Sequence, residues 1–200
     1  MIGEITMIKV NAIGDACPIP VIKTKKAIAE AQGQGTIEVL VDNEIAVQNV
    51  TKMAASEGGN VTSEKVADKE YKITIVLDGT AKEAEAAADE NLVVVVSSDR
   101  MGVGNDDLGK VLIKGFIFAV TQLEKLPKTM LFYNGGATLT AEGSDSLEDL
   151  KHLAEQGVEI LTCGTCLNYY NLSDKLQVGS VTNMYTIVEK MAGADKIIRP

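Results

Sequence analysis

Residues 92–99 read LVVVVSSD, a run of five aliphatic side chains followed by three polar ones. A continuous apolar run of this kind is typical of a strand buried on both faces, as in a parallel sheet with helices on its two sides. Further strands are predicted downstream, at 129–134, 158–162 and 195–199, with helical segments between them. Because strands and helices alternate, residues 92–200 are predicted to form a three-layer α/β/α domain around an open parallel sheet.

The chain upstream of this strand has a different character. Residues 79–91 contain no large apolar side chain and are rich in alanine and acidic residues, which predicts an acidic linker that adds little to any core. Residues 6–78 are predicted to form an N-terminal domain with the element order β-α-β-α-β-β. This order corresponds to a two-layer sandwich of two helices on one sheet, with strands near 6–13, 36–41, 60–66 and 70–77.

The composition limits the classes of partner. The chain has 200 residues and a formal charge of −9, so it lacks the basic surface with which proteins bind nucleic acid or anionic lipid. Its first ten residues lack the apolar stretch of a signal peptide, and its longest apolar run is too short to span a bilayer. Three cysteines are an odd number, which argues against a closed disulfide framework and favours a cytoplasmic protein with reduced thiols.

One cysteine, Cys17, lies in the short motif DACPIP between Asp15 and Pro20, directly before a predicted helix. Pro18 suits the first turn of a helix, where its missing N–H would have no partner, and the two prolines stiffen the loop. A helix N-terminus lowers the pKa of a nearby thiol, so Cys17 is a candidate reactive cysteine; a buried structural cysteine is the alternative. Three lysines follow, which either solvate the helix face or dock an acidic partner and assist the thiolate: Lys23, Lys25 and Lys26.

The other two cysteines, Cys163 and Cys166, form a CGTC motif immediately after the strand predicted at 158–162. Ligand sites of open parallel sheets lie beyond the carboxyl ends of the strands, which is where this motif falls. A C-x-x-C motif can be a redox dithiol, half of a zinc site or a pair of sulfur-handling thiols. Structural zinc needs four ligands, and the chain adds only one histidine, His152, and one other cysteine, so no metal is expected.

Two glycine-containing loops follow predicted strands and are expected to border the same pocket. In the first, Asp107 stands where a dinucleotide-binding fingerprint has its third glycine, and no phosphate-loop lysine follows, so a nucleotide site is only weakly supported. The second loop offers backbone N–H groups to an anion. The residues expected to line the pocket are Gly102, Gly104, Asn134, Gly135 and Gly136.

The segment at 11–28, NAIGDACPIPVIKTKKAI, resembles the signature of the TusA-like (SirA-like) sulfur-carrier family. Its Cys-Pro-x-Pro motif and the glycine before it match the family position by position: Cys17, Pro18, Pro20 and Gly14. Asn11 and Asp15 depart from the family, which usually has an aspartate and an apolar residue at these two positions. The resemblance covers residues 6–78 and implies that Cys17 carries a terminal sulfur as a persulfide.

The second half of the chain, from about residue 91, resembles the DsrE-like family of sulfur-relay proteins. The similarity rests on LVVVVSSD with its glycine-rich loop, on YNGG at 133–136, and on the late cysteine loop followed by TNMYTIVE at 182–189. The two halves joined in this order are similar to the YedF family of sulfurtransferase-like proteins, which are linked to selenium metabolism. The resemblance implies a sulfur or selenium carrier that has no resident cofactor and holds its cargo as a transient cysteine adduct.

The same resemblance implies protein partners. A cysteine or selenocysteine lyase would load the carrier, a downstream protein would accept the chalcogen, and the C-terminal domain would form a homo-oligomer. Either Cys163 or Cys166 matches the reactive position of the DsrE-like family. Two alternatives stay open from the sequence: a partner-binding or regulatory module without turnover, and a dithiol oxidoreductase that uses the C-x-x-C motif.

Overall fold

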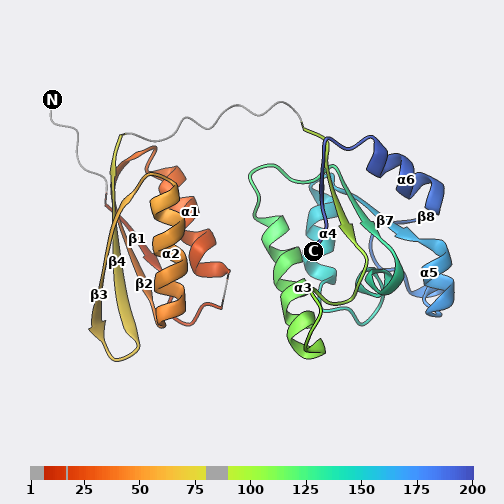
Figure 1. Cartoon of the computed structure of the whole chain (residues 1–200), viewed down its shortest axis with the longest axis horizontal. Helices are drawn as coiled ribbons and strands as arrows, with labels where there is room; N and C mark the ends of the chain where they lie inside the picture. Colours follow the sequence, from red (N-terminus) through yellow and green to blue (C-terminus); the bar gives the residue numbers. More distant parts are fainter. Residues whose placement is uncertain (1–6, 17, 80–89) are drawn as a thin grey trace. The chain divides into compact units, whose positions relative to one another are not determined.

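The computed structural model describes residues 7–16, 18–79 and 90–200. The chain divides into two compact units, Met1–Ala86 and Ala87–Pro200, which are described separately here (Figure 1). Most of the predicted linker at 79–91 lies outside the described residues, so its bounds stay a prediction.

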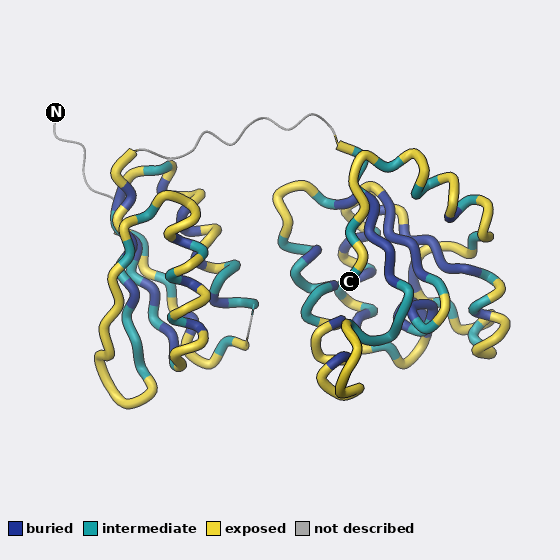
Figure 2. Tube along the Cα trace, viewed as in Figure 1, coloured by how far each residue is buried: buried dark blue, intermediate teal, exposed yellow. Residues whose placement is uncertain are grey.

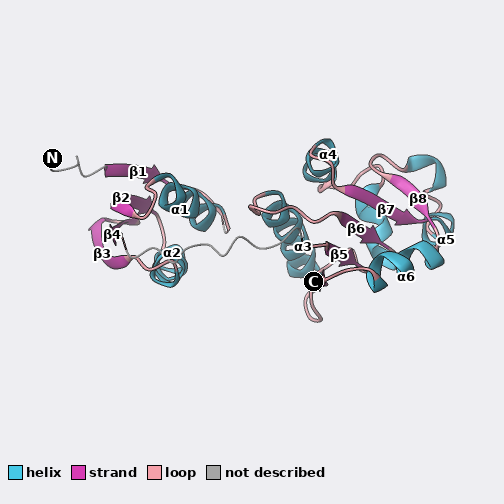
Figure 3. Cartoon of the chain, turned by 90° about the horizontal axis from the view of Figure 1, so that it is seen from above, coloured by secondary structure: helices cyan, strands magenta, loops and turns pink. Residues whose placement is uncertain are grey.

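The first unit is a sandwich of two helices on a mixed four-stranded sheet. The strands lie in the order β1-β2-β4-β3, where β1 runs parallel to β2, and β4 runs antiparallel to both β2 and β3. Both helices cover the same face of this sheet (Figure 3), which confirms the predicted two-layer architecture. The elements are β1 (Met7–Asn11), α1 (Ile19–Glu30), β2 (Gln34–Val41), α2 (Glu44–Ser56), β3 (Asn60–Ala67) and β4 (Glu70–Asp78).

The core of the first unit follows from alternation along its central strands. In β2, side chains alternate between the helix-covered face and the other face, so that Ile37 and Val39 are fully buried. Ile73 and Ile75 of β4 lie in the same cluster, and α2 contributes Val50 from its buried stripe. The packed face therefore fixes the register of β2 on β4, because a shift of one residue would expose the whole set.

The second unit has a five-stranded sheet, in the order β8-β7-β6-β5-β9, in which every pair is parallel. This arrangement confirms the predicted open parallel sheet. No helix in the described part of the chain is both long and apolar enough to cross a membrane. The elements are β5 (Leu92–Val96), α3 (Asp106–Thr121), β6 (Thr129–Phe132), η1 (Asn134–Thr140), α4 (Leu147–Glu155), β7 (Glu159–Cys163), α5 (Gly164–Tyr169), η2 (Ser173–Lys175), β8 (Ser180–Thr182), α6 (Met184–Ala192) and β9 (Lys196–Ile198).

The sheet of the second unit is buried on both faces (Figures 2 and 3). Val94 and Val96 of β5 pack with α3 and α4, whereas Val93 and Val95 point to the opposite face, where α6 packs. Each fully buried aliphatic side chain contributes roughly 1.5–3 kcal/mol of transfer free energy. The aliphatic run at 92–96 therefore has the composition that a strand between two helical layers requires.

The local structure differs from the sequence expectations after β6, after β7 and at β8. Strand β6 ends at Phe132, because Asn134 adopts a left-handed backbone with φ of 50° and starts the 3-10 helix η1 where a loop was expected. Strand β7 continues through Cys163, and the rest of the CGTC loop forms the short helix α5. The edge strand β8 was not predicted, because three residues are too few to show an alternation of apolar and polar side chains.

We predict that Gly136→Ala destabilises the second unit by about 1–3 kcal/mol, because the added methyl group would overlap a strand backbone. An ideal Cβ at Gly136 lies 2.2 Å from the carbonyl oxygen of Val96. Thermal unfolding of the full chain, followed by circular dichroism, measures the change in Tm.

The matched control is Gly115→Ala. An added Cβ there meets no atom within 4 Å, and Gly115 lies within α3. This substitution should raise stability by about 0.5–1 kcal/mol, since alanine loses less backbone entropy in a helix. Equal effects of the two substitutions would contradict the close approach of η1 to β5.

Candidate functional site

Cys17 itself lies outside the described residues, but the chain is placed on both sides of it. Helix α1 starts at Ile19, whose N–H donates to the carbonyl of Ala16 at 2.9 Å. Pro18 occupies the N-cap position and Pro20 lies in the first turn. N–H groups in the first turn have no partner within the helix, so the missing N–H of proline costs no hydrogen bond there. The Cys-Pro-x-Pro motif therefore joins the end of a loop to the start of a helix.

The loop before Cys17 is held from the sheet side by Asp42. Its carboxylate accepts a hydrogen bond from the N–H of Gly14 at 2.9 Å and another from the amide of Asn43 at 2.7 Å. The side chain of Asn43 in turn caps α2 by accepting from the N–H of Ala46 at 2.8 Å. The hydrogen bond from Asn43, followed by that from Gly14, lowers the pKa of Asp42 because both stabilise the charged form.

The same loop is held from the helix side by Lys23. Its ammonium lies 2.5 Å from the carboxylate of Asp15 and donates to the carbonyl of Asn11 at 3.1 Å. Asp15 is one of the two positions that depart from the TusA-like pattern, and here it supplies the ion pair. Lys23 is thus engaged inside the loop, which favours a structural role for it over direct docking of an acidic partner. Lys25 pairs with Glu57 at 3.7 Å.

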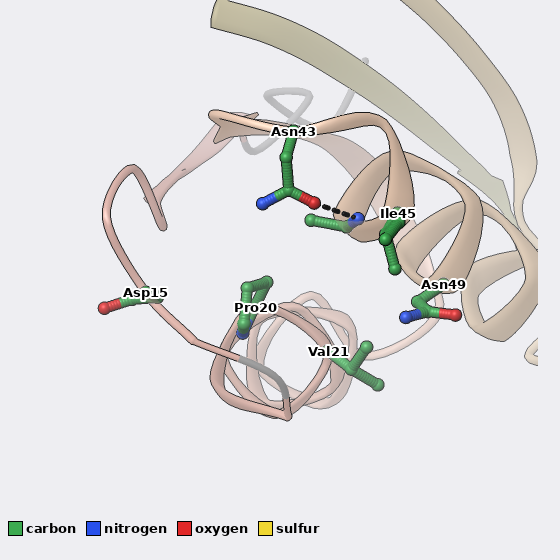
Figure 4. A pocket seen from close by; sticks show the side chains of 7 residues that line it. Asp15, Pro20, Val21, Asn43, Ile45 and Asn49 are labelled. Atoms are coloured by element: carbon green, nitrogen blue, oxygen red, sulfur yellow. Dashed lines mark hydrogen bonds between the residues drawn. The ribbon is translucent and has the colours of Figure 1, made fainter. Parts of the chain in front are cut away.

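A pocket opens beside this loop, between the first turns of α1 and α2 (Figure 4). Its walls combine aliphatic carbon with two asparagine amides, and Ile45 at its rim is 68% exposed. The first unit therefore presents an apolar surface next to the Cys-Pro-x-Pro loop. The pocket is lined by Asp15, Pro20, Val21, Asn43, Ile45, Ala46 and Asn49.

The second thiol site lies at the carboxyl end of β7, as expected for a parallel sheet. Cys163 is the last residue of the strand and is only 2% exposed, whereas Cys166 lies in α5 and is half-buried. Cys166 packs against the apolar cluster that contains Cys163, and both cysteines are free thiols. The motif thus places two reduced thiols at one strand end, one buried in the core and one reaching the surface.

Asn134 connects this thiol pair to the neighbouring strand. Its backbone N–H donates to Sγ of Cys166 at 3.0 Å, and its side-chain oxygen accepts from the hydroxyl of Tyr170 at 3.1 Å. Tyr170 was not predicted as a site residue. Its spacing of four residues from Cys166 is the signal that could have found it, because such a spacing places two residues on the same side of a helical turn.

The four glycines of the two loops differ in their surroundings. Gly135 and Gly136 pack closely on the end of β5, where an added Cβ would lie 3.2 Å from the N of Asp99 or 2.2 Å from the carbonyl oxygen of Val96. Gly102 and Gly104 have no atom within 4 Å of an added Cβ and lie exposed in the loop before α3. The structure therefore brings Asn134 to the thiol site, while these four glycines shape the backbone around it.

The surroundings of Cys166 raise the pKa of its thiol. Burial is the largest cause, since it disfavours the thiolate, and the neighbouring Cys163 adds to it. The N–H of Asn134 acts in the opposite direction because it stabilises the charged sulfur. Cys166 is therefore mainly a neutral thiol at pH 7 in the unloaded protein. Among the described residues, no cluster of three or more His, Cys, Asp or Glu could hold a metal ion.

Comparisons with known proteins agree with this division into two parts. Residues 8–76 match the family described as sulfurtransferase TusA, and residues 72–200 match the DsrE/DsrF-like family. A putative sulfur carrier protein of Methanocaldococcus jannaschii is 35% identical over 71 residues, which are 36% of this chain and 95% of that protein. Another, from Archaeoglobus fulgidus, is 38% identical over 63 residues, or 31% of this chain and 72% of that protein. The crystal structure of a SirA-like protein from Desulfitobacterium hafniense is 44% identical and covers 35% of this chain and 96% of that one, with a TM-score of 0.34.

We predict that alkylation of Cys166 by iodoacetamide has a pH midpoint above the ordinary cysteine value of about 8.5. Only the thiolate reacts, and burial keeps the thiol protonated to higher pH. Peptide mass mapping after short pulses at increasing pH measures the modification at each cysteine separately.

Tyr170→Phe should move this midpoint further up, because loss of the hydroxyl loosens Asn134 and weakens its N–H bond to the sulfur. Tyr169→Phe is the matched control, since Tyr169 is 80% exposed on the adjacent position. A Cys166 midpoint at or below that of a free cysteine peptide would show that burial does not control this thiol.

We also predict that the N–H of Gly14 exchanges faster with solvent in Asp42→Ala, since the substitution removes its acceptor. The pKa of Asp42 is lowered, so in the wild type this protection is present above the unfolded-state value of about 4. It should be lost only as the pH falls through the lower folded-state pKa. Amide exchange followed by NMR at several pH values tests both statements.

Glu44→Ala is the control for this exchange measurement. Glu44 neighbours the same cap but bonds the hydroxyl of Tyr71, at 3.4 Å, instead of the Cys17 loop. Faster exchange at Gly14 in both variants would assign the effect to α2 as a whole and would contradict a specific role for Asp42.

Proposed function

The chain belongs to the DsrE/DsrF-like family, with a TusA domain at its N-terminus, and from this membership we propose that it carries sulfur or selenium between cysteine thiols. The resemblances to TusA-like and DsrE-like proteins are thereby confirmed, whereas the link to YedF proteins and to selenium is part of the proposal. One observation carries it: a Cys-Pro-x-Pro loop and a pair of neighbouring reduced thiols at a strand end occur in the same chain.

The first step of the proposed function takes place at Cys17. Its thiolate attacks the outer sulfur of a persulfide on a donor protein, so that the donor leaves as a thiol and Cys17 becomes the persulfide. Two hydrogen bonds support this role, one donated by the N–H of Gly14 to Asp42 and one donated by Lys23 to the carbonyl of Asn11, since they reduce the freedom of the chain just before Cys17. The pocket beside the loop offers the donor or acceptor an apolar contact.

The second step passes the chalcogen to the C-terminal domain. Cys166 is the more accessible acceptor of the chalcogen, because it is half-buried whereas Cys163 is almost fully buried. Placing both sites on one chain raises their effective concentration relative to separate proteins. A cysteine or selenocysteine lyase is the proposed donor and a further protein the final acceptor. A homo-oligomer formed through the second domain and a cytoplasmic location belong to the same proposal.

A dithiol oxidoreductase is the second candidate function. The packing of Cys166 against the cluster that contains Cys163 favours it, because a disulfide forms only between thiols that already lie close together. In that case the two cysteines would cycle between dithiol and disulfide, and Cys17 would be dispensable.

Intact-mass spectrometry tests the proposed function. The reduced full chain is incubated with a cysteine lyase and cysteine, or a selenocysteine lyase and selenocysteine, and its mass is compared with that of Cys17→Ser, Cys163→Ser and Cys166→Ser. We expect the wild type to gain a sulfur or selenium atom, and Cys17→Ser to gain none from the lyase. The added atom vanishes on treatment with a reductant, which distinguishes it from irreversible oxidation.

Full loading of Cys17→Ser by the lyase would contradict the carrier role of this cysteine. No adduct on any variant, together with a disulfide between Cys163 and Cys166, would favour the oxidoreductase instead.

A further inference from the structure

We propose that the thiol pair of the second domain discharges the carried atom as hydrosulfide, or as hydroselenide, by closing a disulfide between Cys163 and Cys166. This inference rests on the proposed function, because it begins with a persulfide on Cys166. It goes beyond carriage, since it gives the second domain a reductive step of its own and assigns different roles to the two cysteines.

The first support is the unequal burial of the two thiols of the C-x-x-C motif. Cys163 lies within the apolar cluster of Leu131, Leu161 and Ile187, and a sulfur atom added to it would need space inside that cluster. Cys166 is half-buried and reaches the surface. An incoming sulfane sulfur therefore loads Cys166, and Cys163 is left as the neighbouring thiol.

The second support is the direction of attack. Displacement at sulfur requires the attacking sulfur, the attacked sulfur and the leaving sulfur to lie roughly in line. Cys163 is buried in the cluster against which Cys166 packs, so in the proposed step it approaches Cys166 from the core while the terminal sulfur lies toward solvent. In this arrangement Cys163 meets the inner sulfur of the persulfide and not the outer one. Attack on the inner sulfur releases the terminal atom, whereas attack on the outer one would move it into the core.

The third support is the hydrogen bond from the N–H of Asn134 to Sγ of Cys166. In the persulfide this Sγ is the inner sulfur, and a donor directed at it withdraws electron density and makes it a better electrophile. Tyr170 holds the side chain of Asn134 and is a positioning residue in this step. The same N–H stabilises negative charge on Cys166 when the disulfide is later reduced.

The atoms and electrons of the step balance. The persulfide anion on Cys166 and the thiol of Cys163 give one disulfide and one hydrosulfide ion, and the proton of Cys163 leaves with the hydrosulfide. The sulfane sulfur gains two electrons, and the two cysteine sulfurs lose them. A dithiol reductant then restores both thiols by thiol–disulfide exchange. With selenium as the cargo, hydroselenide leaves in the same way.

This step places the chain between two classes of reaction. The reaction before it must supply a chalcogen at the oxidation level of a persulfide. The reaction after it consumes a fully reduced hydrosulfide or hydroselenide ion, which is a nucleophile, without needing a reductant of its own. Release of an ion is consistent with the positions of the two thiols, since Cys163 ends the buried strand β7 and Cys166 follows it in α5, nearer the surface.

The test uses full-length Cys17→Ser, loaded directly with inorganic tetrasulfide, so that it does not depend on the lyase. Reduced protein is freed of reductant and mixed with a limiting amount of tetrasulfide. The remaining polysulfide is removed at once, and hydrosulfide released afterwards is trapped with monobromobimane over time. Peptide mass mapping of quenched samples reports persulfide and disulfide at each cysteine. The matched variants Cys17→Ser/Cys163→Ser and Cys17→Ser/Cys163→Ala lack the attacking thiol.

We expect Cys17→Ser to release hydrosulfide after loading and to gain a Cys163–Cys166 disulfide at the same rate. Both variants without Cys163 should retain a persulfide on Cys166, with release reduced to the level of protein lacking all three cysteines. Retention of the added sulfur on Cys166 by both variants also serves as the check that loading occurred.

Two results would overturn the inference: a persulfide on Cys166 that persists in the presence of Cys163, or equal release with and without Cys163. Either result would leave Cys17 as a carrier untouched, because Cys17 is absent from these proteins. Conversely, failure of lyase loading at Cys17 would refute the proposed carrier while leaving the discharge step measurable.

Discussion

The parallel pairing of β6 with β7 is the constraint on which the thiol site depends. Phe132 lies opposite Thr162 in this pair, so both strands end at the same edge and their next residues meet there. Asn134 follows β6 by two residues, and its N–H reaches Cys166, which lies in α5 directly after β7. The buried faces of the sheet hold this register, because a slip of one residue would turn Cys163 away from its apolar cluster.

Burial then sets the chemistry of the two thiols. It removes Cys163 from solvent and raises the pKa of Cys166, so the thiol of Cys166 is less readily ionised and less reactive toward oxidants. In the proposed discharge step, a persulfide on Cys166 would be more acidic than the thiol and would place charge in an environment that disfavours it. This opposition between burial and charge would favour discharge of the loaded state over its storage.

The N-terminal site follows a different principle. The loop before Cys17 runs outside the core, and polar contacts to Asp42 and Lys23 order it in place of burial. Asp15 departs from the TusA-like pattern, and its carboxylate forms an ion pair with Lys23. Lys23 also donates a hydrogen bond to the carbonyl of Asn11. The residues before Cys17 are therefore ordered by polar contacts at the surface and not by packing in the core.

The sequence by itself determined both architectures and the chemical class of each site. The aliphatic run at 92–96 predicts a doubly covered strand, and alternation along 36–41 predicts a strand covered on one face, because burial imposes these two patterns directly on composition. The motif residues likewise follow from local rules on prolines, helix starts and C-x-x-C spacing.

Only the tertiary structure decided which residues meet. The neighbours of the thiols, Asn134 and Tyr170, depend on contacts between segments distant in the chain. The same holds for the glycines that pack on the end of β5 and for the unequal burial of Cys163 and Cys166. Such contacts are set by sheet order and register, and no single segment of sequence carries that information.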